Sequence, residues 1–270
     1  MSATSESDRV LQAFQQAFQP ELEAAVGAYD LPDGVRVLDS PCGDGFYANL
    51  FARHMRSGTL VAADLSHECL DRARNAIRPL SPSLAVEFHR ADAYRLPFDD
   101  CSFDLVWCAQ SFITLDDPVR ALRELARVLR RGGQVAVLET DEYHHVLLPW
   151  PVGLELAVQR AVRDECRYRY RDAAKFAQTR DLRSEFREAG LMPTVKRTVA
   201  ADRSAPFGTK EREFLTRHLN YLRKFVHMEL TPREMASLEK ATDANDPESL
   251  INRLDSELTC ISTISHATKA

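Results

Sequence analysis

Three aspartates each close a short apolar segment of strand type. Asp39 follows "VRVL", Asp64 follows "GTLVAA" and Asp92 follows "LAVEFHRA". In a parallel sheet the carboxyl ends of the strands meet at one edge, and ligands bind there. An ionised carboxylate accepts hydrogen bonds and cannot donate them. The three side chains therefore predict a site for hydroxyl groups, amino groups or a cation.

A glycine turn follows the first of these segments. "GDGFYA" at 43–48 satisfies G-x-G-x-x-G/A, and Asp64 comes about 20 residues later, as in dinucleotide-binding proteins. A pyrophosphate, however, needs backbone N–H groups without nearby anions. Asp39 and Asp44 lie in or beside the turn, and at roughly 4–6 Å each would repel a phosphate charge by a few kcal/mol at an effective dielectric constant near 20. S-adenosylmethionine carries a sulfonium and an ammonium group and no phosphate, so the acidic turn favours this cofactor.

The segments around these residues alternate between strand and helix patterns. Strands are expected at 35–40, 58–66, 84–92, 102–110 and 134–142, with helices at 45–55, 67–80 and 117–133. Further on, strands are expected at 193–202 and 258–268, and helices at 148–176, 181–191, 210–228, 231–242 and 247–258. Apolar strands joined by crossover helices predict an α/β fold with a doubly wound, mostly parallel, seven-stranded sheet of Rossmann-like type.

The domain organisation follows from this alternation. Residues 1–32 form an N-terminal helical segment, which Pro20 interrupts, and 33–145 form the cofactor-binding core. Residues 146–178 are a helical cap insertion after the fifth strand, and 179–270 supply strands six and seven with a second helical insertion at 208–257. Both insertions are expected to roof the carboxyl edge of the sheet.

Four stretches carry a family resemblance: "VLDSPCGDG", "VAADLS", "RADAYRLPF" and "FDLVWCAQSFITLDDPVRALRELARVLRRGGQVAVLE". Across about residues 35–142 the chain resembles the class I S-adenosylmethionine-dependent methyltransferases, in the ubiquinone/menaquinone-type group. The family loop D-x-G-x-G-x-G is matched by Asp39, Gly43 and Gly45, and Pro41 departs from it. Proline fixes φ near −65° and has no N–H, so we expect a stiffened loop that still allows a ligand to approach closely.

The resemblance implies ten cofactor-binding residues: Asp39, Ser40, Gly43, Gly45, Asp64, Leu65, Asp92, Ala93, Cys108 and Gln110. Asp39 would orient the methionine amino group, Asp64 would accept the ribose hydroxyls, and Asp92 would hold the adenine amino edge. Gln110, beside the Cys108 carbonyl, would close the methionyl side. In the alternative interpretation each aspartate merely caps a turn or a helix, and Gln110 is structural.

Methyl transfer is an in-line displacement, for which the protein supplies mainly proximity and alignment. Oxygen and carbon acceptors often need a general base as well. The candidate bases are His144 and His145 in "ETDEYHHV", which would point apart on regular structure; the alternative is a surface or capping role. No metal site is expected, because spaced ligands are lacking around these histidines. The product would be S-adenosyl-L-homocysteine.

Composition restricts the partner. The net charge is −5 and the pI is near 5.9, which disfavours nucleic acid. The predicted acceptor is a small apolar or aromatic molecule, and the oligomeric state stays open. The start "MSATSESDRV" lacks a secretory pattern, no apolar run could span a membrane, and six scattered cysteines suggest a reducing compartment. We therefore expect a cytoplasmic enzyme. The rival hypotheses are a non-catalytic cofactor-binding partner or sensor, and an NAD-dependent oxidoreductase.

Overall fold

A computed structural model of the chain describes residues 5–140, 146–170 and 178–270. The chain divides into two compact units. The core unit comprises Glu23–Thr140, Gln178–Val199 and Ser262–Ala270, and the helical unit comprises Met1–Leu22, Asp141–Ala177 and Ala200–Ile261. The strands β7 (Met192–Ser204) and β8 (Glu257–Thr268) each contribute residues to both units.

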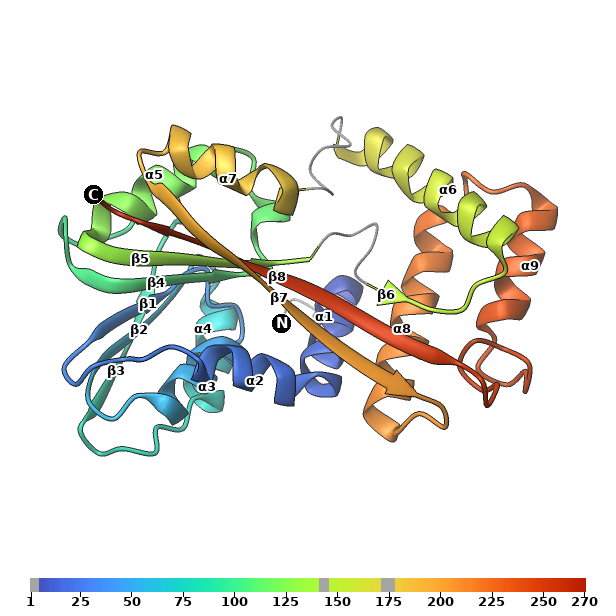
Figure 1. Ribbon diagram of the computed structural model, residues 1–270, viewed down its shortest axis with the longest axis horizontal. Helices are drawn as coiled ribbons and strands as arrows, with labels where there is room; N and C mark the ends of the chain where they lie inside the picture. The colour runs from blue at the N-terminus through green and yellow to red at the C-terminus, as the bar shows by residue number, and fades with distance from the viewer. Residues whose placement is uncertain (1–4, 141–145, 171–177) are drawn as a thin grey trace. The chain divides into compact units, whose positions relative to one another are not determined.

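Five parallel strands dominate the sheet of the core unit (Figure 1). They follow the order β3 (Leu84–Arg90), β2 (Gly58–Asp64), β1 (Arg36–Asp39), β4 (Phe103–Ala109) and β5 (Leu129–Glu139). β8 pairs antiparallel with β5, and β7 pairs with β8. This order confirms the doubly wound, mostly parallel α/β fold. Within the described residues the sheet has eight strands instead of the expected seven, because the two-residue strand β6 (Val146–Leu147) adds to β8 opposite Cys260 and Thr259.

Helices cover both faces of this sheet. α3 (Phe46–His54) and α4 (His67–Ala76) pack against β2, whereas α5 (Pro118–Val128) packs against β5 and against α7 (Gln178–Glu188). On the α5 side the core joins strand residues such as Leu38 and Val106 to Leu122 and Phe186. On the other side Trp107 contacts the rings of Phe51 and Tyr47, with centroids 5.4 and 5.5 Å apart. Burial on both faces explains why the strands read as almost continuously apolar.

One predicted helix extended too far into the strand that follows it. The helix expected at 117–133 ends at Val128, and Leu129–Gly133 belong to β5. There the Lys269 ammonium group donates to the carbonyl oxygens of Arg127 and Leu129, and Gly132 adopts φ 75°. These contacts come from the far end of the chain, so the local helical pattern could not reveal them.

The helix expected at 247–258 is absent: residues 247–256 form turns, and Glu257 and Leu258 begin β8. The Asp246 carboxylate accepts the Glu248 N–H at 2.8 Å, and the Asn252 side-chain amide donates to the Ala244 and Asp246 carbonyls at 2.8 Å each. Asp and Asn side chains compete with helical hydrogen bonds in this way.

The helical unit is built on α1 (Glu6–Ala17), α6 (Val152–Tyr170), α8 (Thr209–Val226) and α9 (Pro232–Thr242). α1 packs against α8, and α6 packs against α8 and α9. The rings of Phe14, Phe18 and Phe214 lie 5.1–5.6 Å apart between α1 and α8. Pro20 is the second residue of α2 (Gln19–Gly27), so the chain restarts there as expected. Over the described residues, none of the helices combines the length and the apolar character needed to cross a bilayer.

Candidate functional site

The turn after β1 is tied to the strands on either side of it. The Ser40 N–H donates to the Trp107 carbonyl of β4 and the Cys42 N–H to the Ala63 carbonyl of β2, both at 2.9 Å. The Gly45 N–H then closes the turn on the Cys42 carbonyl at 3.0 Å. Proline at 41 is compatible with this arrangement because the donors of the turn come from its neighbours. The turn is therefore formed, and it lies at the carboxyl edge of the sheet, in the core unit.

Asp39 is a buried carboxylate at the end of β1, with 1% of its surface exposed. Burial raises the pKa of the Asp39 carboxyl well above its usual value, a hydrogen bond from the Ala48 backbone opposes the shift, and the charges of Asp64 and Asp44 add to it. Among the described residues, nothing donates a hydrogen bond to Asp39 Oδ2. A buried acceptor without a donor costs about 1–3 kcal/mol. A cationic donor from a ligand would remove that cost.

Asp64, at the end of β2, has a different environment although it is also buried. Its Oδ2 accepts the Gly43 N–H at 2.9 Å, and its Oδ1 accepts the Ser66 N–H at 2.8 Å. Asp64 thus anchors the glycine turn to the start of α4. Each carboxylate oxygen can accept a second hydrogen bond, so this anchoring is compatible with binding a hydroxyl group as well.

The two glycines of the turn have different surroundings. Gly43 adopts φ 54°, and a Cβ built on it would meet no atom within 4 Å. Gly45 adopts φ 86°, and a Cβ there would lie 2.8 Å from the Cβ of Ala73 in α4. The close packing of α3 on α4 therefore explains the glycine at 45 without a ligand, whereas the open space at Gly43 is available to one.

Leu65, Asp92 and Ala93 follow β2 and β3. Leu65 is 59% exposed although it is a large apolar residue. The Asp92 Oδ1 accepts the Tyr94 N–H at 2.9 Å and its carbonyl accepts the Arg95 N–H at 2.9 Å, so Asp92 shapes a local turn. Ala93 is partly buried in that turn. The turn role of Asp92 matches the alternative interpretation, and its part in binding adenine stays a prediction.

The segment after β4 contains the last two predicted residues. The Cys108 side chain lies in the core on the α5 face, and burial raises the pKa of its thiol. Only the backbone of Cys108 is therefore suited to the predicted role. Gln110 adopts φ 53°, and its side-chain Oε1 accepts the hydroxyl hydrogen of Tyr47 at 3.1 Å.

Sequence reasoning assigned no role to Tyr47 or Glu139. Both are buried; Tyr47 contacts Gln110, and Glu139 ends β5 and accepts the N–H groups of Ser111 and Phe112 at 2.7 Å each. Glu139 carried the same signal as Asp39, an acid at the end of an apolar strand, and could have been found by it. Tyr47 had no such signal, because its partner is 63 residues away. His144 and His145 lie outside the described residues.

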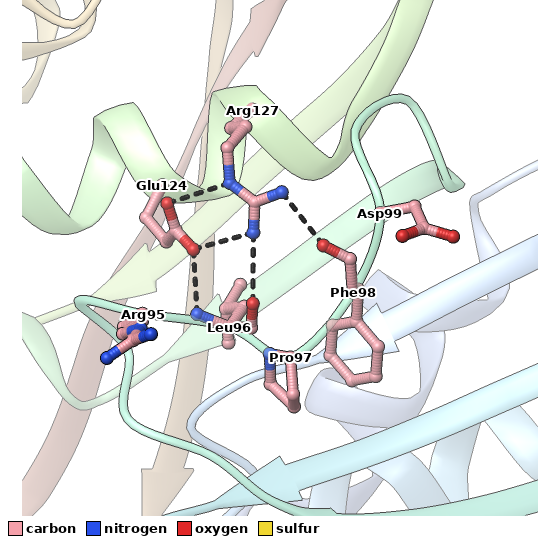
Figure 2. Close-up of a pocket in the computed structure, with 7 residues that line it drawn as sticks. All are labelled: Arg95, Leu96, Pro97, Phe98, Asp99, Glu124 and Arg127. Atoms are coloured by element: carbon pink, nitrogen blue, oxygen red, sulfur yellow. Dashed lines mark hydrogen bonds and ion pairs between the residues drawn. The ribbon is translucent and has the colours of Figure 1, made fainter.

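A pocket of about 550 Å³ opens elsewhere on the core unit, around Arg95–Asp99, Glu124 and Arg127 (Figure 2). Figure 2 shows that two of its charged groups pair with each other and with the backbone: the Arg127 guanidinium donates to the Glu124 carboxylate and to the Leu96 and Phe98 carbonyls. None of the predicted cofactor residues lines this pocket. These bonds hold the loop around Leu96 and Phe98 in place, and we do not place the cofactor site in this pocket.

The residues at the ends of β1 and β2 fit S-adenosylmethionine. In the part of the chain that the structure describes, Asp39 Oδ2 has no donor and suits an ammonium group, and the open space at Gly43 lets a ligand approach the backbone closely. The exposed Leu65 offers an apolar surface to adenine. The two carboxylates Asp39 and Asp64 are unfavourable for a pyrophosphate.

Comparison with known proteins agrees with this geometry. Residues 38–137 match a family model described as a methyltransferase domain. The chain is 31% identical over 167 residues to the 27-O-demethylrifamycin SV methyltransferase of Amycolatopsis mediterranei, covering 62% of this chain and 57% of the relative. It is 35% identical over 116 residues to the 2-phytyl-1,4-naphtoquinone methyltransferase of Synechococcus elongatus, covering 43% of this chain and 50% of the relative. The chain thus spans about half the length of these curated relatives.

Among solved structures, the Bacillus halodurans protein BH2331 superposes with a TM-score of 0.54 at 20% identity, covering 96% of this chain and 98% of that chain. At this level of identity the likeness concerns the fold alone.

Proposed function

We propose that this protein, whose residues 38–137 match a family model described as a methyltransferase domain, transfers a methyl group from S-adenosylmethionine to a small-molecule acceptor. The observation that supports the proposal best is the buried Asp39 carboxylate, whose Oδ2 has no donor among the described residues. A site that keeps such an acceptor at the carboxyl edge of a parallel sheet favours a cationic ligand.

The residues of the core unit would divide the cofactor between them. Asp39 accepts the ammonium group of the methionine part, and Gly43 lets the backbone of the turn lie against it. Asp64 accepts the ribose hydroxyls while it keeps its bonds to the Gly43 and Ser66 N–H groups. Leu65 and the Asp92–Ala93 turn border the adenine. When bound, S-adenosylmethionine supplies an electrophilic methyl group and leaves as S-adenosylhomocysteine. The chain itself contributes mainly proximity and alignment.

The proposed acceptor is apolar or aromatic. The two curated relatives are named for a rifamycin derivative and for a phytyl naphthoquinone, and both names describe molecules of that kind. His144 or His145 would act as a general base if the acceptor must lose a proton. This acceptor class and this role are proposals.

Titration calorimetry tests the cofactor. S-adenosylhomocysteine should bind, and NADH, as the matched control with a pyrophosphate, should not. Binding of NADH with no binding of S-adenosylhomocysteine would refute the proposal and favour an oxidoreductase.

A turnover assay then tests the reaction. Radiolabelled methyl from S-adenosylmethionine should appear in at least one acceptor of a panel of quinols, phenols and macrolactam phenols. If S-adenosylhomocysteine binds and label is never transferred to any acceptor of the panel, the protein is a non-catalytic cofactor-binding protein instead.

A further inference from the structure

Gln110, the residue directly after β4, holds a backbone conformation that side-chain-bearing residues rarely adopt. Its φ is 53°, a left-handed geometry that is unfavourable for a residue with a Cβ. Its N–H donates to the Leu138 carbonyl in β5 at 2.8 Å. Such strain persists only where the surrounding structure enforces it, and it gathers at functional sites.

Tyr47 in α3 holds the Gln110 side chain. Its hydroxyl donates to Gln110 Oε1 at 3.1 Å, and its ring packs against Trp107 with centroids 5.5 Å apart. Burial, together with the charges of Glu139 and Asp39, raises the pKa of the Tyr47 phenol, so the hydroxyl keeps its proton and remains a donor. A donor on Oε1 sets the orientation of the amide, and with it the direction in which the amide N–H groups donate.

Glu139, at the end of β5, holds the backbone that follows. One carboxylate oxygen accepts the N–H groups of both Ser111 and Phe112 at 2.7 Å. The Ser111 hydroxyl donates back to the Ala109 carbonyl at 2.8 Å. The turn at 110–112 is therefore held from two other elements, α3 and β5, before any ligand binds.

We propose that Tyr47 is a positioning residue for methyl transfer: it orients the Gln110 amide so that its N–H groups donate to the carboxylate of the methionine part of the cofactor, while Glu139 keeps the turn in place. This inference rests on the proposed function. It adds two residues that neither the sequence pattern nor the likeness to known proteins had assigned. Tyr47 acts through Gln110 and makes no contact with the methyl group itself.

The test compares Tyr47→Phe with Tyr29→Phe. Both changes delete one hydroxyl from a buried or mostly buried phenol that packs against Trp107, but the Tyr29 hydroxyl bonds to His266 Nε2 at 2.6 Å instead of to Gln110. Calorimetry measures the affinity for two ligands, S-adenosylhomocysteine and 5′-methylthioadenosine. The second ligand keeps the adenosine but lacks the ammonium and carboxylate groups of the amino-acid part.

Tyr47→Phe should weaken the binding of S-adenosylhomocysteine about 3- to 10-fold, as expected for the loss of one hydrogen bond. The affinity for 5′-methylthioadenosine should not change. Tyr29→Phe should change neither affinity. Equal losses for both ligands would mean a merely structural role and would overturn the inference, as would no loss at all.

Gln110→Ala provides the second variant. It should reproduce the loss for S-adenosylhomocysteine alone, and adding Tyr47→Phe to it should cause no further loss, because the two residues act as one unit. If Tyr47→Phe does not fold, Gln110→Ala decides, and an unchanged affinity there overturns the inference. If the unaltered protein binds 5′-methylthioadenosine and S-adenosylhomocysteine equally well, the proposed function stands and this inference falls. If it binds neither, both fall.

Discussion

Replacing Asp39 by asparagine removes one buried negative charge and keeps the shape of the side chain. The carboxylate has 1% of its surface exposed, and its Oδ2 has no donor among the residues that the structure describes. In the proposed site this oxygen accepts the ammonium group of the cofactor. The substitution therefore separates two effects that oppose each other: binding loses an ion pair, and the unliganded protein loses a buried charge.

The binding effect follows from the strength of one charge-assisted hydrogen bond. Such a bond contributes about 1.5–3 kcal/mol, which corresponds to roughly a 10- to 150-fold change in the dissociation constant. The asparagine amide also points an N–H donor toward the ammonium group, so we expect a loss of affinity near the upper end of this range for Asp39→Asn.

The effect on folding has the opposite sign. Because burial raises the pKa of Asp39 in the folded state above its usual value, the stability linked to this group is fully present below the usual pKa and is lost as the pH rises through the folded-state pKa. Asparagine does not ionise. At neutral pH the unliganded Asp39→Asn protein should therefore unfold at a higher temperature, by roughly 2–4 °C for each 1 kcal/mol recovered, and the gain should vanish below about pH 4.

Asp64→Asn is the matched control. Both oxygens of Asp64 accept backbone N–H groups, from Gly43 and Ser66, and an amide can accept through only one atom. This variant should lose about 1–3 kcal/mol of unfolding free energy and melt at a lower temperature. Differential scanning calorimetry of the unliganded proteins and titration with S-adenosylhomocysteine measure both quantities.

Two results would refute this reasoning. An unchanged affinity of Asp39→Asn for S-adenosylhomocysteine would show that Asp39 is not the ammonium partner. A lower melting temperature of unliganded Asp39→Asn at neutral pH would show that the carboxylate is satisfied in the folded chain, contrary to its raised pKa.

Four further outcomes are expected. Because burial raises the pKa of the Asp39 carboxyl, the affinity for S-adenosylhomocysteine should fall as the pH falls through that pKa, since a protonated carboxyl cannot form an ion pair with the ammonium group; an affinity that does not change with pH would contradict this. Gly45→Ala should lower the melting temperature by several degrees, because its Cβ would lie 2.8 Å from that of Ala73, and binding to the folded fraction should persist; a wild-type melting curve would count against the packing argument. Gly43→Ala should weaken binding more than stability, since nothing lies within 4 Å of its Cβ; unchanged affinity would remove Gly43 from the site. Burial lowers the pKa of His266, so its contribution to stability is present above pH 6.5 and lost as the pH falls through the folded value; urea unfolding from pH 8 to 5 should show this loss in the wild type and not in His266→Gln.

The sequence alone determined the parallel part of the fold and the sheet edge at which the cofactor site is predicted. Runs of apolar residues that alternate with amphipathic segments can bury both faces of a sheet only in a βαβ arrangement. Asp39 and Asp64 end neighbouring strands, and parallel strands bring their carboxyl ends to one edge, so local pattern was sufficient to predict that these acids meet.

Only the tertiary structure decided which partners each of those residues contacts. Within residues 5–140, 146–170 and 178–270, Asp64 accepts two backbone N–H groups whereas Asp39 Oδ2 has no donor. In the same residues Gly45 makes room for Ala73, whereas nothing lies close to a Cβ placed on Gly43. These differences depend on burial and on partners distant in the sequence. The types and spacing of residues predict where helices and strands form. Which donor pairs with which acceptor is decided only when the whole chain has packed, because the partners are distant in the sequence.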